Sequence, residues 1–340
     1  MAHAIARPRP VAALVAIAGL LALAAPARAT LVYVKKPGAE SAVVYVARDD
    51  GSERRRVDSG RAPAVSPDGN WIAWIARDAG LDELRLQRAG GGATLLVVRS
   101  RRIDAVRFSP DSTIVGAVLS ARRLRLYTLS SDTVVPVGSG FIRGWTFSPD
   151  SKAIAWGRAS DPAPEAPGDI YAAPIAPGAR ARRVTRTKDA LNPLWGAQGI
   201  IFDRQRSRPG DAPVYNLWAI QPDGSGLRRI TRLKIPSLAS GLVPLDLSAD
   251  GSRLLAGLTA QHTLIISFTV DPQSGATRAL SKHVKQGLVG DDLSADGTTI
   301  LAHTGGPNPA VAHDVVTVPY AKRAKPTVLA HRAADPHWSR

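Results

Sequence analysis

The chain has no cysteine among its 340 residues, so no disulfide can stabilise its fold and no lipid can attach to a cysteine after an export signal. It contains neither a G-x-S-x-G nucleophile elbow nor a P-loop, and Gly224-Ser225-Gly226 is typical of a turn rather than of a cofactor-binding loop. Beyond the N-terminus no apolar run approaches the ~18 residues that a transmembrane helix needs. These absences predict no cofactor, no catalytic residue and no membrane span.

The first 29 residues have the pattern of a secretory signal peptide. Arg7 and Arg9 precede an apolar stretch over residues 11–25, and Ala27-Arg28-Ala29 forms an A-x-A site before Thr30. The alternative is an uncleaved anchor, but the apolar stretch is too short to span a bilayer. We therefore expect cleavage between Ala29 and Thr30, and export to the periplasm, the cell surface or the medium.

One short phrase recurs through the rest of the chain. It reads Ser-Pro-Asp-Gly at Ser66, Ser-Pro-Asp-Ser at Ser109 and Ser148, and Ser-Ala-Asp-Gly at Ser248 and Ser294. Proline favours the first corner of a turn, aspartate can accept bonds from nearby backbone N–H groups, and glycine accepts a positive φ. The phrase therefore predicts a tight hairpin between two strands. If the fourth position is left-handed, Ser112 and Ser151 each cost about 1 kcal/mol there.

The spacing of the phrase predicts the architecture. Successive serines lie 43, 39, 100 and 46 residues apart, and a copy with Gly196 in the serine position divides the long interval into steps of 48 and 52. A period in the forties is typical of a β-propeller with four-stranded blades. The continuous apolar runs behind the turns, as at Ile72–Ala76, indicate strands that are buried between neighbouring blades. We therefore expect an all-β propeller.

The two ends of the chain predict how the ring closes. Third strands are expected at Ala42–Ala47, Glu83–Gln87, Arg123–Leu129, Asp169–Ile175, Asn216–Gln221, Thr263–Val270 and Val315–Pro319. Residues 31–58 lack a first strand, whereas the last six residues resemble a first strand that ends at its serine, Ser339. We therefore expect seven blades, one of them split between the N- and C-terminus. The ring has six blades if Gly196 or Ser339 does not begin a blade.

The chain is strongly basic, with a net charge of +16, or +13 (41 basic against 28 acidic residues) without Arg7, Arg9 and Arg28. Such a charge attracts polyanions, but the export signal argues against nucleic acid as the partner. Arginine clusters at residues 54–56 and 180–183 fall on expected outer strands. They are either solvated strand faces or a surface for an anionic envelope polymer or lipid head groups.

Polar residues enter the expected innermost strands, which line the channel of a propeller and form a concave site at its mouth. These residues are Arg61, Asp104, Arg107, Arg143, Asn192, Asp246, Asp291, Asp292, Asp335 and His337. They either bind a ligand or partner or pair with one another.

Three long loops between second and third strands emerge on the same face, at Ala159–Gly168, Gln205–Pro213 and Thr304–Ala312. Function tends to reside in loops held by a rigid scaffold. We therefore expect this face to bind the partner, with Arg204, Arg206 and Arg208 at the second loop contributing.

The histidines that remain after cleavage all lie in the last third of the chain, at His262, His283, His303, His313, His331 and His337. A metal site needs imidazoles that converge from several blades. Only His337 falls on an expected innermost strand, so we expect scattered surface histidines and no metal. A channel metal is the alternative.

The phrase Phe147-Ser148-Pro149-Asp150-Ser151, the strand at Asp169-Ile170-Tyr171 and the strand at Arg183-Val184-Thr185 together resemble one TolB-like, or WD40-like, β-propeller repeat. The resemblance extends over residues 31–340 and predicts one TolB-like domain at residues 30–340. It implies an exported protein that binds other macromolecules. In the TolB protein a small α/β domain precedes the propeller, but here the first strand follows the cleavage site by two residues. We therefore expect neither that domain nor the Tol–Pal role.

The sequence favours an exported, non-catalytic, monomeric scaffold that binds another envelope or extracellular protein. Similar propellers in oligogalacturonate lyases hold a divalent metal through channel histidines, so a metal-dependent polysaccharide lyase is the main alternative. A module that binds anionic envelope polymers through its basic outer surface is a third. Similar propellers also precede serine-peptidase domains, but this chain has neither the nucleophile elbow nor room for a hydrolase domain.

Overall fold

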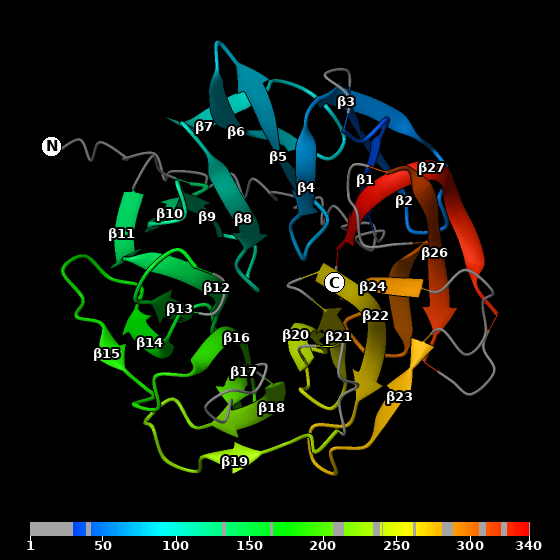
Figure 1. The fold of residues 1–340 in the computed structure, drawn as a ribbon. Helices are drawn as coiled ribbons and strands as arrows, with labels where there is room; N and C mark the ends of the chain where they lie inside the picture. Colours follow the sequence, from blue (N-terminus) through cyan, green and yellow to red (C-terminus); the bar gives the residue numbers. More distant parts are fainter. Residues whose placement is uncertain are drawn as a thin grey trace, which may run out of the picture.

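The computed structural model describes residues 30–38, 42–130, 134–163, 166–206, 214–233, 239, 241–260, 263–280, 288–305, 311–320 and 325–339. Within these residues there is no α-helix, and the strands form seven four-stranded antiparallel blades around a central axis (Figure 1). The described part of the chain contains no helix that is long and apolar enough to cross a membrane. Ala29, Arg208, His262 and His283, which were considered above, lie outside the described residues.

Each blade runs from an innermost strand at the axis to an outer strand at the rim. The first blade consists of β4 (Arg61–Val65), β5 (Trp71–Asp78), β6 (Leu81–Arg88) and β7 (Leu95–Ser100). The second consists of β8 (Ile103–Phe108), β9 (Ile114–Leu119), β10 (Arg123–Thr128) and β11 (Val134–Ser139). The third consists of β12 (Phe141–Phe147), β13 (Ala153–Ala159), β14 (Gly168–Pro174) and β15 (Arg182–Arg183). The fourth and fifth are β16 (Ala190–Gly196), β17 (Gly199–Arg206), β18 (Val214–Ile220) and β19 (Arg228–Arg229); and β20 (Gly241–Leu247), β21 (Leu254–Ala260), β22 (Thr263–Val270) and β23 (Thr277–Ala279). The third strands expected from the sequence in these five blades are confirmed as β6, β10, β14, β18 and β22, and the two expected at Ala42–Ala47 and Val315–Pro319 are confirmed in the remaining two blades.

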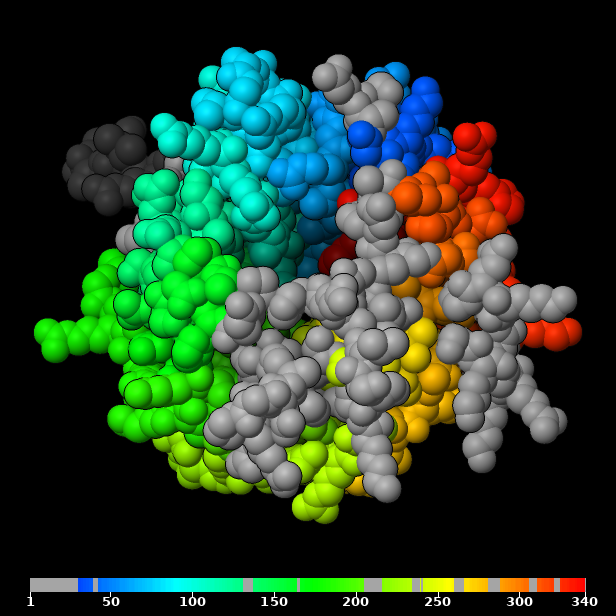
Figure 2. All heavy atoms as spheres, viewed as in Figure 1, coloured from blue at the N-terminus to red at the C-terminus, as the bar shows by residue number. Residues whose placement is uncertain are grey.

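The last strand of the chain belongs to two blades. The sixth blade contains β24 (Leu288–Leu293), β25 (Thr299–Thr304), β26 (His313–Pro319) and the first half of β27 (Thr327–Trp338). The second half of β27 then pairs with β1 (Thr30–Lys35) as the innermost strand of the seventh blade, which β2 (Val43–Arg48) and β3 (Arg55–Ser59) complete. The blue N-terminal strands accordingly lie against the red C-terminal strand (Figures 1 and 2). The split blade is confirmed, and Gly196 does end an innermost strand, since it pairs with Gly199 across a short turn.

The recurring phrase forms the hairpin between the first and second strand of a blade. At Ser66 the backbone N–H donates to the Trp71 carbonyl over 2.8 Å, and the serine hydroxyl accepts the Trp71 N–H over 2.9 Å. The same two bonds recur at the other phrase serines, Ser109, Ser148, Ser248 and Ser294. They also join Ser339 to Thr30, both at 2.8 Å. The two ends of the chain therefore reproduce the bonding of a hairpin without a covalent connection between the two strands.

The fourth residue of the phrase is left-handed in every copy, which is the condition under which the two serines cost backbone strain. φ is +72° at Gly69 and Gly251, +64° at Gly297, and +61° and +59° at Ser112 and Ser151. Each of the two serines gains a bond that glycine cannot make. The Ser112 hydroxyl accepts the Asp68 N–H, and the Ser151 hydroxyl accepts the Asp111 N–H, both over 3.0 Å. The strain at these positions is offset by hydrogen bonds that tie the hairpins of successive blades together.

The hydrophobic core lies between the faces of neighbouring blades. One cluster joins the first two blades through residues such as Ile75, Leu84, Ile103 and Val115, and another joins the second and third blades around Trp145. The second strands are buried on both faces, since β5 and β9 are buried over most of their length. This explains their continuous apolar sequence and leaves the channel and the loops as the surfaces for function.

Candidate functional site

The innermost strands of the second to fifth blades enclose a cavity of about 370 Å³ in the channel. Its lining residues are Arg107, Arg143, Gly144, Trp145, Leu191, Asn192, Pro193, Leu194, Asp203, Val243, Pro244, Leu245 and Thr259. We call this the channel cavity. Three of the residues expected at the channel mouth, Arg107, Arg143 and Asn192, come together in it.

Irregular strand pairing shapes the channel cavity. Each of the four innermost strands shifts register against its second strand, between Asp104 and Arg107, Arg143 and Trp145, Leu191 and Leu194, and Pro244 and Asp246. A β-bulge of this kind bends the strand and re-aims its side chains. In β16 the bulge holds Asn192 in a left-handed conformation with φ of +48°. The bulges therefore interrupt the regular alternation of side chains between the two faces of each strand, and they turn polar side chains toward the cavity.

The cavity contains a buried acid that the sequence interpretation missed. Asp203 in β17 is 1% exposed, and neither of its carboxyl oxygens has a hydrogen-bond partner among the described residues. Burial raises the pKa of Asp203 to about 7. The neighbouring Asn192 side chain opposes this shift, but it does not reach hydrogen-bonding geometry with either oxygen.

A signal for Asp203 was present in the sequence, although it was hidden within the second strand. Asp203 follows the apolar residues Ile200, Ile201 and Phe202 of β17, whereas the polar residues that the sequence predicts at the channel all lie on expected innermost strands. Superposing the repeats by their serine positions would have identified an acid in a run that is otherwise apolar. A strongly perturbed carboxyl in a concave site marks a candidate functional site.

The channel mouth and the loop face meet at Arg143. Its guanidinium donates to the carbonyls of Pro162 and Ala163, at 2.5 and 2.7 Å, in the loop between β13 and β14. This loop lies beside the start of the innermost strand because Ala159 pairs with Phe141. Arg143 therefore fixes a long loop against the rim of the channel cavity.

The opposite side of the channel holds a second group of titratable residues. The His303 Nδ1 atom lies 2.8 Å from Asp291 Oδ2, and the His303 ring stacks on His313 with centroids 5.4 Å apart. Burial raises the pKa of Asp291, against a hydrogen bond from His303. Burial also raises the pKa of Asp335, which the Ala62 backbone N–H, His303 and Arg61 oppose. The expectation that all histidines are scattered on the surface is wrong for His303, because the bulge in β24 brings Asp291 against a buried second-strand side chain.

Several polar residues of the innermost strands tie one blade to the next. Asp246 accepts the Leu293 backbone N–H over 2.7 Å, and Asp292 accepts the Trp338 N–H over 3.5 Å. The His337 Nδ1 atom accepts the Val65 N–H over 3.4 Å. The three bonds are equivalent. In each, a side chain two residues before the phrase serine of one blade accepts a backbone N–H from the residue directly before the phrase serine of the next blade. The structure thus places Asp246, Asp292 and His337 in the ring itself rather than at an open site.

The remaining sequence candidates are engaged close to where they were expected. Arg61 donates to the buried carboxylate of Asp82 at 2.7 Å, and Asp104 pairs with Arg102 at 2.9 Å. Arg204 bonds to both carboxylate oxygens of Asp189, at 2.7 and 2.8 Å, and lies over the Trp218 ring. Arg206 is the last residue of β17. Arg61, Asp104 and Arg204 are not among the residues that line the channel cavity.

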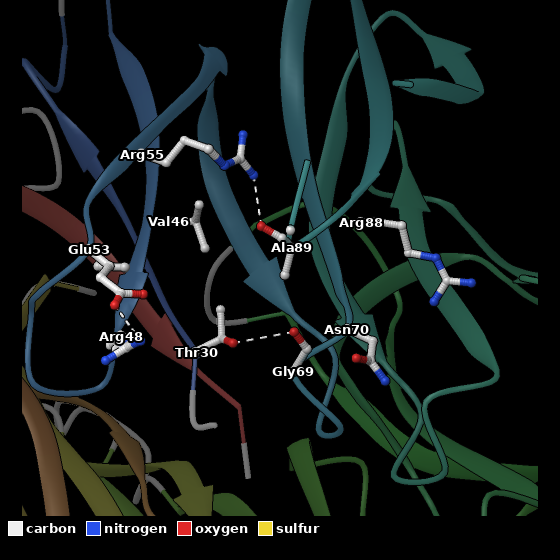
Figure 3. Close-up of a pocket in the computed structure, with 11 residues that line it drawn as sticks. Thr30, Val46, Arg48, Glu53, Arg55, Gly69, Asn70, Arg88 and Ala89 are labelled. Carbon is white, nitrogen blue, oxygen red and sulfur yellow. Dashed lines mark hydrogen bonds and ion pairs between the residues drawn. The ribbon is translucent and has the colours of Figure 1, made fainter. Parts of the chain in front are cut away.

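A second hollow of about 440 Å³ lies on the face of the phrase turns, between the seventh and first blades (Figure 3). Three arginines and one glutamate line it, namely Arg48, Arg55, Arg88 and Glu53. Each of these charged groups already makes at least one contact. Arg48 pairs with Glu53, Arg55 donates to the Ala89 carbonyl at 2.8 Å, and Arg88 lies 3.9 Å from the centre of the Trp71 ring. The channel cavity is the stronger site because it alone of the two contains an unsatisfied buried carboxyl.

No group of three or more histidine, cysteine, aspartate or glutamate side chains that could hold a metal ion occurs among the described residues. His303, His313 and Asp291 therefore do not converge as a ligand set in the described part of the chain.

The fold has many solved relatives, whereas neither a protein-family model nor a curated protein sequence matches this chain. The β-propeller domain of the trilobed protease from Pyrococcus furiosus has a TM-score of 0.66 at 11% identity, over 89% of this chain and 95% of that one. TolB from Acinetobacter baumannii has a TM-score of 0.56 at 16% identity, over 91% and 82%. An oligogalacturonate lyase in complex with manganese has a TM-score of 0.58 at 13% identity, over 90% and 86%. Identities this low show the fold alone, and a fold shared by a protease, a lyase and TolB does not assign an activity. With its four-stranded blades and its recurring Ser-Pro-Asp-Gly hairpins, the chain is a β-propeller of the TolB-like fold.

Proposed function

We propose that this propeller is an exported, non-catalytic scaffold that binds another envelope or extracellular protein at its channel mouth. The observation that carries the proposal is the channel cavity, where Arg107, Arg143, Asn192 and the unsatisfied Asp203 come together. Concave sites with a few convergent polar groups and a perturbed acid are the usual places for recognition.

The loop face supports the same proposal. Arg143 links the channel cavity to the loop between β13 and β14, so a partner at the mouth contacts both surfaces. The propeller holds these loops on rigid strands, which reduces the entropy lost on binding. Arg107 lines the channel cavity, is exposed and adds positive charge there.

Affinity capture from the native envelope fraction tests the proposal, with the full chain as bait. Arg107→Glu should reduce capture of the partner about tenfold or more, because it reverses a charge at the rim. The matched control is Arg88→Glu, which changes an exposed arginine on the opposite face and should leave capture unchanged. Equal capture by both variants and the unaltered chain would contradict the proposal. Removing Ala159–Gly168 should also abolish capture.

The arginine-lined hollow favours a second function, the binding of an anionic envelope polymer. Arg48, Arg55 and Arg88 gather around it with Glu53 as the single acid in the lining (Figure 3). A polyphosphate probe tests this function. Binding there should weaken steeply with added salt and in Arg55→Ala, whereas Arg107→Ala should have no effect. Binding at the channel mouth should depend less on salt.

A further inference from the structure

Asp203 breaks a pattern that the other blades follow. In each blade, one residue of the second strand pairs with the innermost-strand residue that lies five positions before the serine position of the phrase. In the seven blades, this second-strand residue is Val34, Ile75, Val118, Gly157, Asp203, Gly257 and His303. Five of these residues are apolar or glycine, as burial between blades requires. His303 is compensated by its bond to Asp291. Asp203 has no such compensation.

An uncompensated buried carboxyl weakens a fold, so its presence calls for another explanation. Residues that break a local rule without a structural gain tend to be functional. The carboxyl of Asp203 faces the channel cavity, and the groups that it lacks are hydrogen-bond donors. As a carboxylate it offers two acceptor oxygens to a ligand.

We propose that Asp203 anchors a primary ammonium group, that of a lysine side chain, which the partner protein inserts into the channel cavity. The inference rests on the proposed function and names the chemistry of its contact. Leu191, Leu194, Val243 and Pro244 give the cavity apolar walls that suit the methylene stem of a lysine.

The acceptors in the cavity match an ammonium better than a guanidinium. An ammonium is a compact group whose three donors can reach acceptors on several sides, whereas a guanidinium is a larger planar group that pairs side-on with a single carboxylate. The oxygens of Asn192 and Thr259 line the same cavity as Asp203 and add acceptors. Arg107 and Arg143 at the rim favour an acidic residue next to the inserted lysine, since they carry the opposite charge.

The probe for this inference is n-butylammonium, which reproduces the lysine side chain, measured by calorimetry on the full chain. Binding should weaken about tenfold or more in Asp203→Asn, since the variant loses the charge that the ammonium pairs with. It should also weaken about tenfold from about pH 8 to about pH 6, because the acid form of Asp203 replaces the carboxylate. The matched control is Asp189→Asn, which removes a carboxylate of the same blade that is already bonded to Arg204 and should not change binding.

Two results would overturn the inference. One is equal binding of n-butylammonium by Asp203→Asn and the unaltered chain. The other is binding of butyrate instead, with an affinity that rises toward acid pH, because the cavity then accepts a carboxylate against a protonated Asp203. If n-butylammonium binds as expected while no partner is captured, only the proposed function fails. If the partner is captured equally well by Asp203→Asn, only the lysine contact fails.

Discussion

The carboxyl of Asp203 destabilises the propeller at neutral pH. A shift from the ordinary aspartate value of 3.8 to a pKa of about 7 corresponds to about 4 kcal/mol of unfolding free energy. The folded state binds the proton more tightly than the unfolded state. This destabilisation is therefore absent below about pH 4, grows between about pH 4 and about pH 7, and is complete above that.

Asp203→Asn should consequently stabilise the protein by about 2–4 kcal/mol at about pH 8 and by almost nothing near pH 4. The asparagine keeps the shape of the side chain but has no charge to desolvate. Urea unfolding of both proteins across this pH range measures the difference. The comparison with Asp189→Asn, whose carboxylate is bonded to Arg204, should show no such gain. If Asp203→Asn and the unaltered chain are equally stable at pH 8, the Asp203 carboxylate does not destabilise the fold.

Ser112 combines a strained backbone with a hydrogen bond to the neighbouring blade. Ser112→Gly relieves the left-handed strain but loses the acceptor for the Asp68 N–H, so the two effects of about 1 kcal/mol each should cancel. Ser112→Ala keeps the strain and loses the bond, and should destabilise by about 1–2 kcal/mol. Denaturant unfolding separates the two variants. Equal stabilities of Ser112→Gly and Ser112→Ala would show that the left-handed strain contributes nothing, and a Ser112→Gly variant more stable than the unaltered chain by the full strain energy would show that the bond between the hairpins contributes nothing.

The carboxylates of Asp246 and Asp292 accept backbone N–H groups of the next blade, so hydrogen bonds connect neighbouring blades as well as the strands within each blade. Asp246→Ala removes the nearer acceptor of the buried Leu293 N–H, which keeps only the Asp292 Oδ1 atom at 3.1 Å, and should cost about 1–2 kcal/mol. Asp246→Asn retains an acceptor oxygen and should cost less. The test is the unfolding free energy of the two variants, and a smaller loss in Asp246→Ala than in Asp246→Asn would refute the tie.

The strands could be predicted from the sequence because turn chemistry and burial act locally. The phrase residues fix each hairpin through bonds within five positions, as at Ser66 and Trp71, and the apolar runs report burial between blades. Even the copy without a serine, at Gly196, was found by spacing alone. The glycine at the fourth position of three copies is a local signal of the same kind, and the left-handed φ at Ser112 and Ser151 agrees with it.

The site could be predicted only in part, since it depends on contacts between elements that lie far apart in the sequence. Counting back from the serine identified Arg107, Arg143 and Asn192, which meet in the channel cavity. It could not distinguish them from Asp246, whose carboxylate bonds to the next blade. Asp203 could not be predicted because a single acid within an apolar strand is recognised as exceptional only when the equivalent positions of the other blades are compared.

At the scale of the whole ring, one junction between the two ends of the chain holds the first and last strands together. The Ser339 N–H donates to the Thr30 carbonyl, and the Thr30 N–H donates to the Ser339 hydroxyl. Trp338 is buried beside them, and its indole N–H donates to the Leu293 carbonyl at 3.2 Å. No covalent bond supports this junction, since the chain has no cysteine. Non-covalent strand pairing must therefore close the ring.

Deleting residues 335–340 should destabilise the whole propeller rather than one blade. The deletion exposes the inner edge of β1, removes the Trp338 side chain and leaves Asp292 without the Trp338 N–H. Truncating a buried tryptophan alone costs about 3–5 kcal/mol, so Trp338→Ala should lower the melting temperature and the deletion should lower it further. Ser339→Ala is the matched control, because it removes only the acceptor for the Thr30 N–H and should cost about 1 kcal/mol. Calorimetry should show one cooperative transition at a lower temperature in each case, since neighbouring blades share their cores. An unchanged melting temperature for the deletion would place the closure of the ring elsewhere.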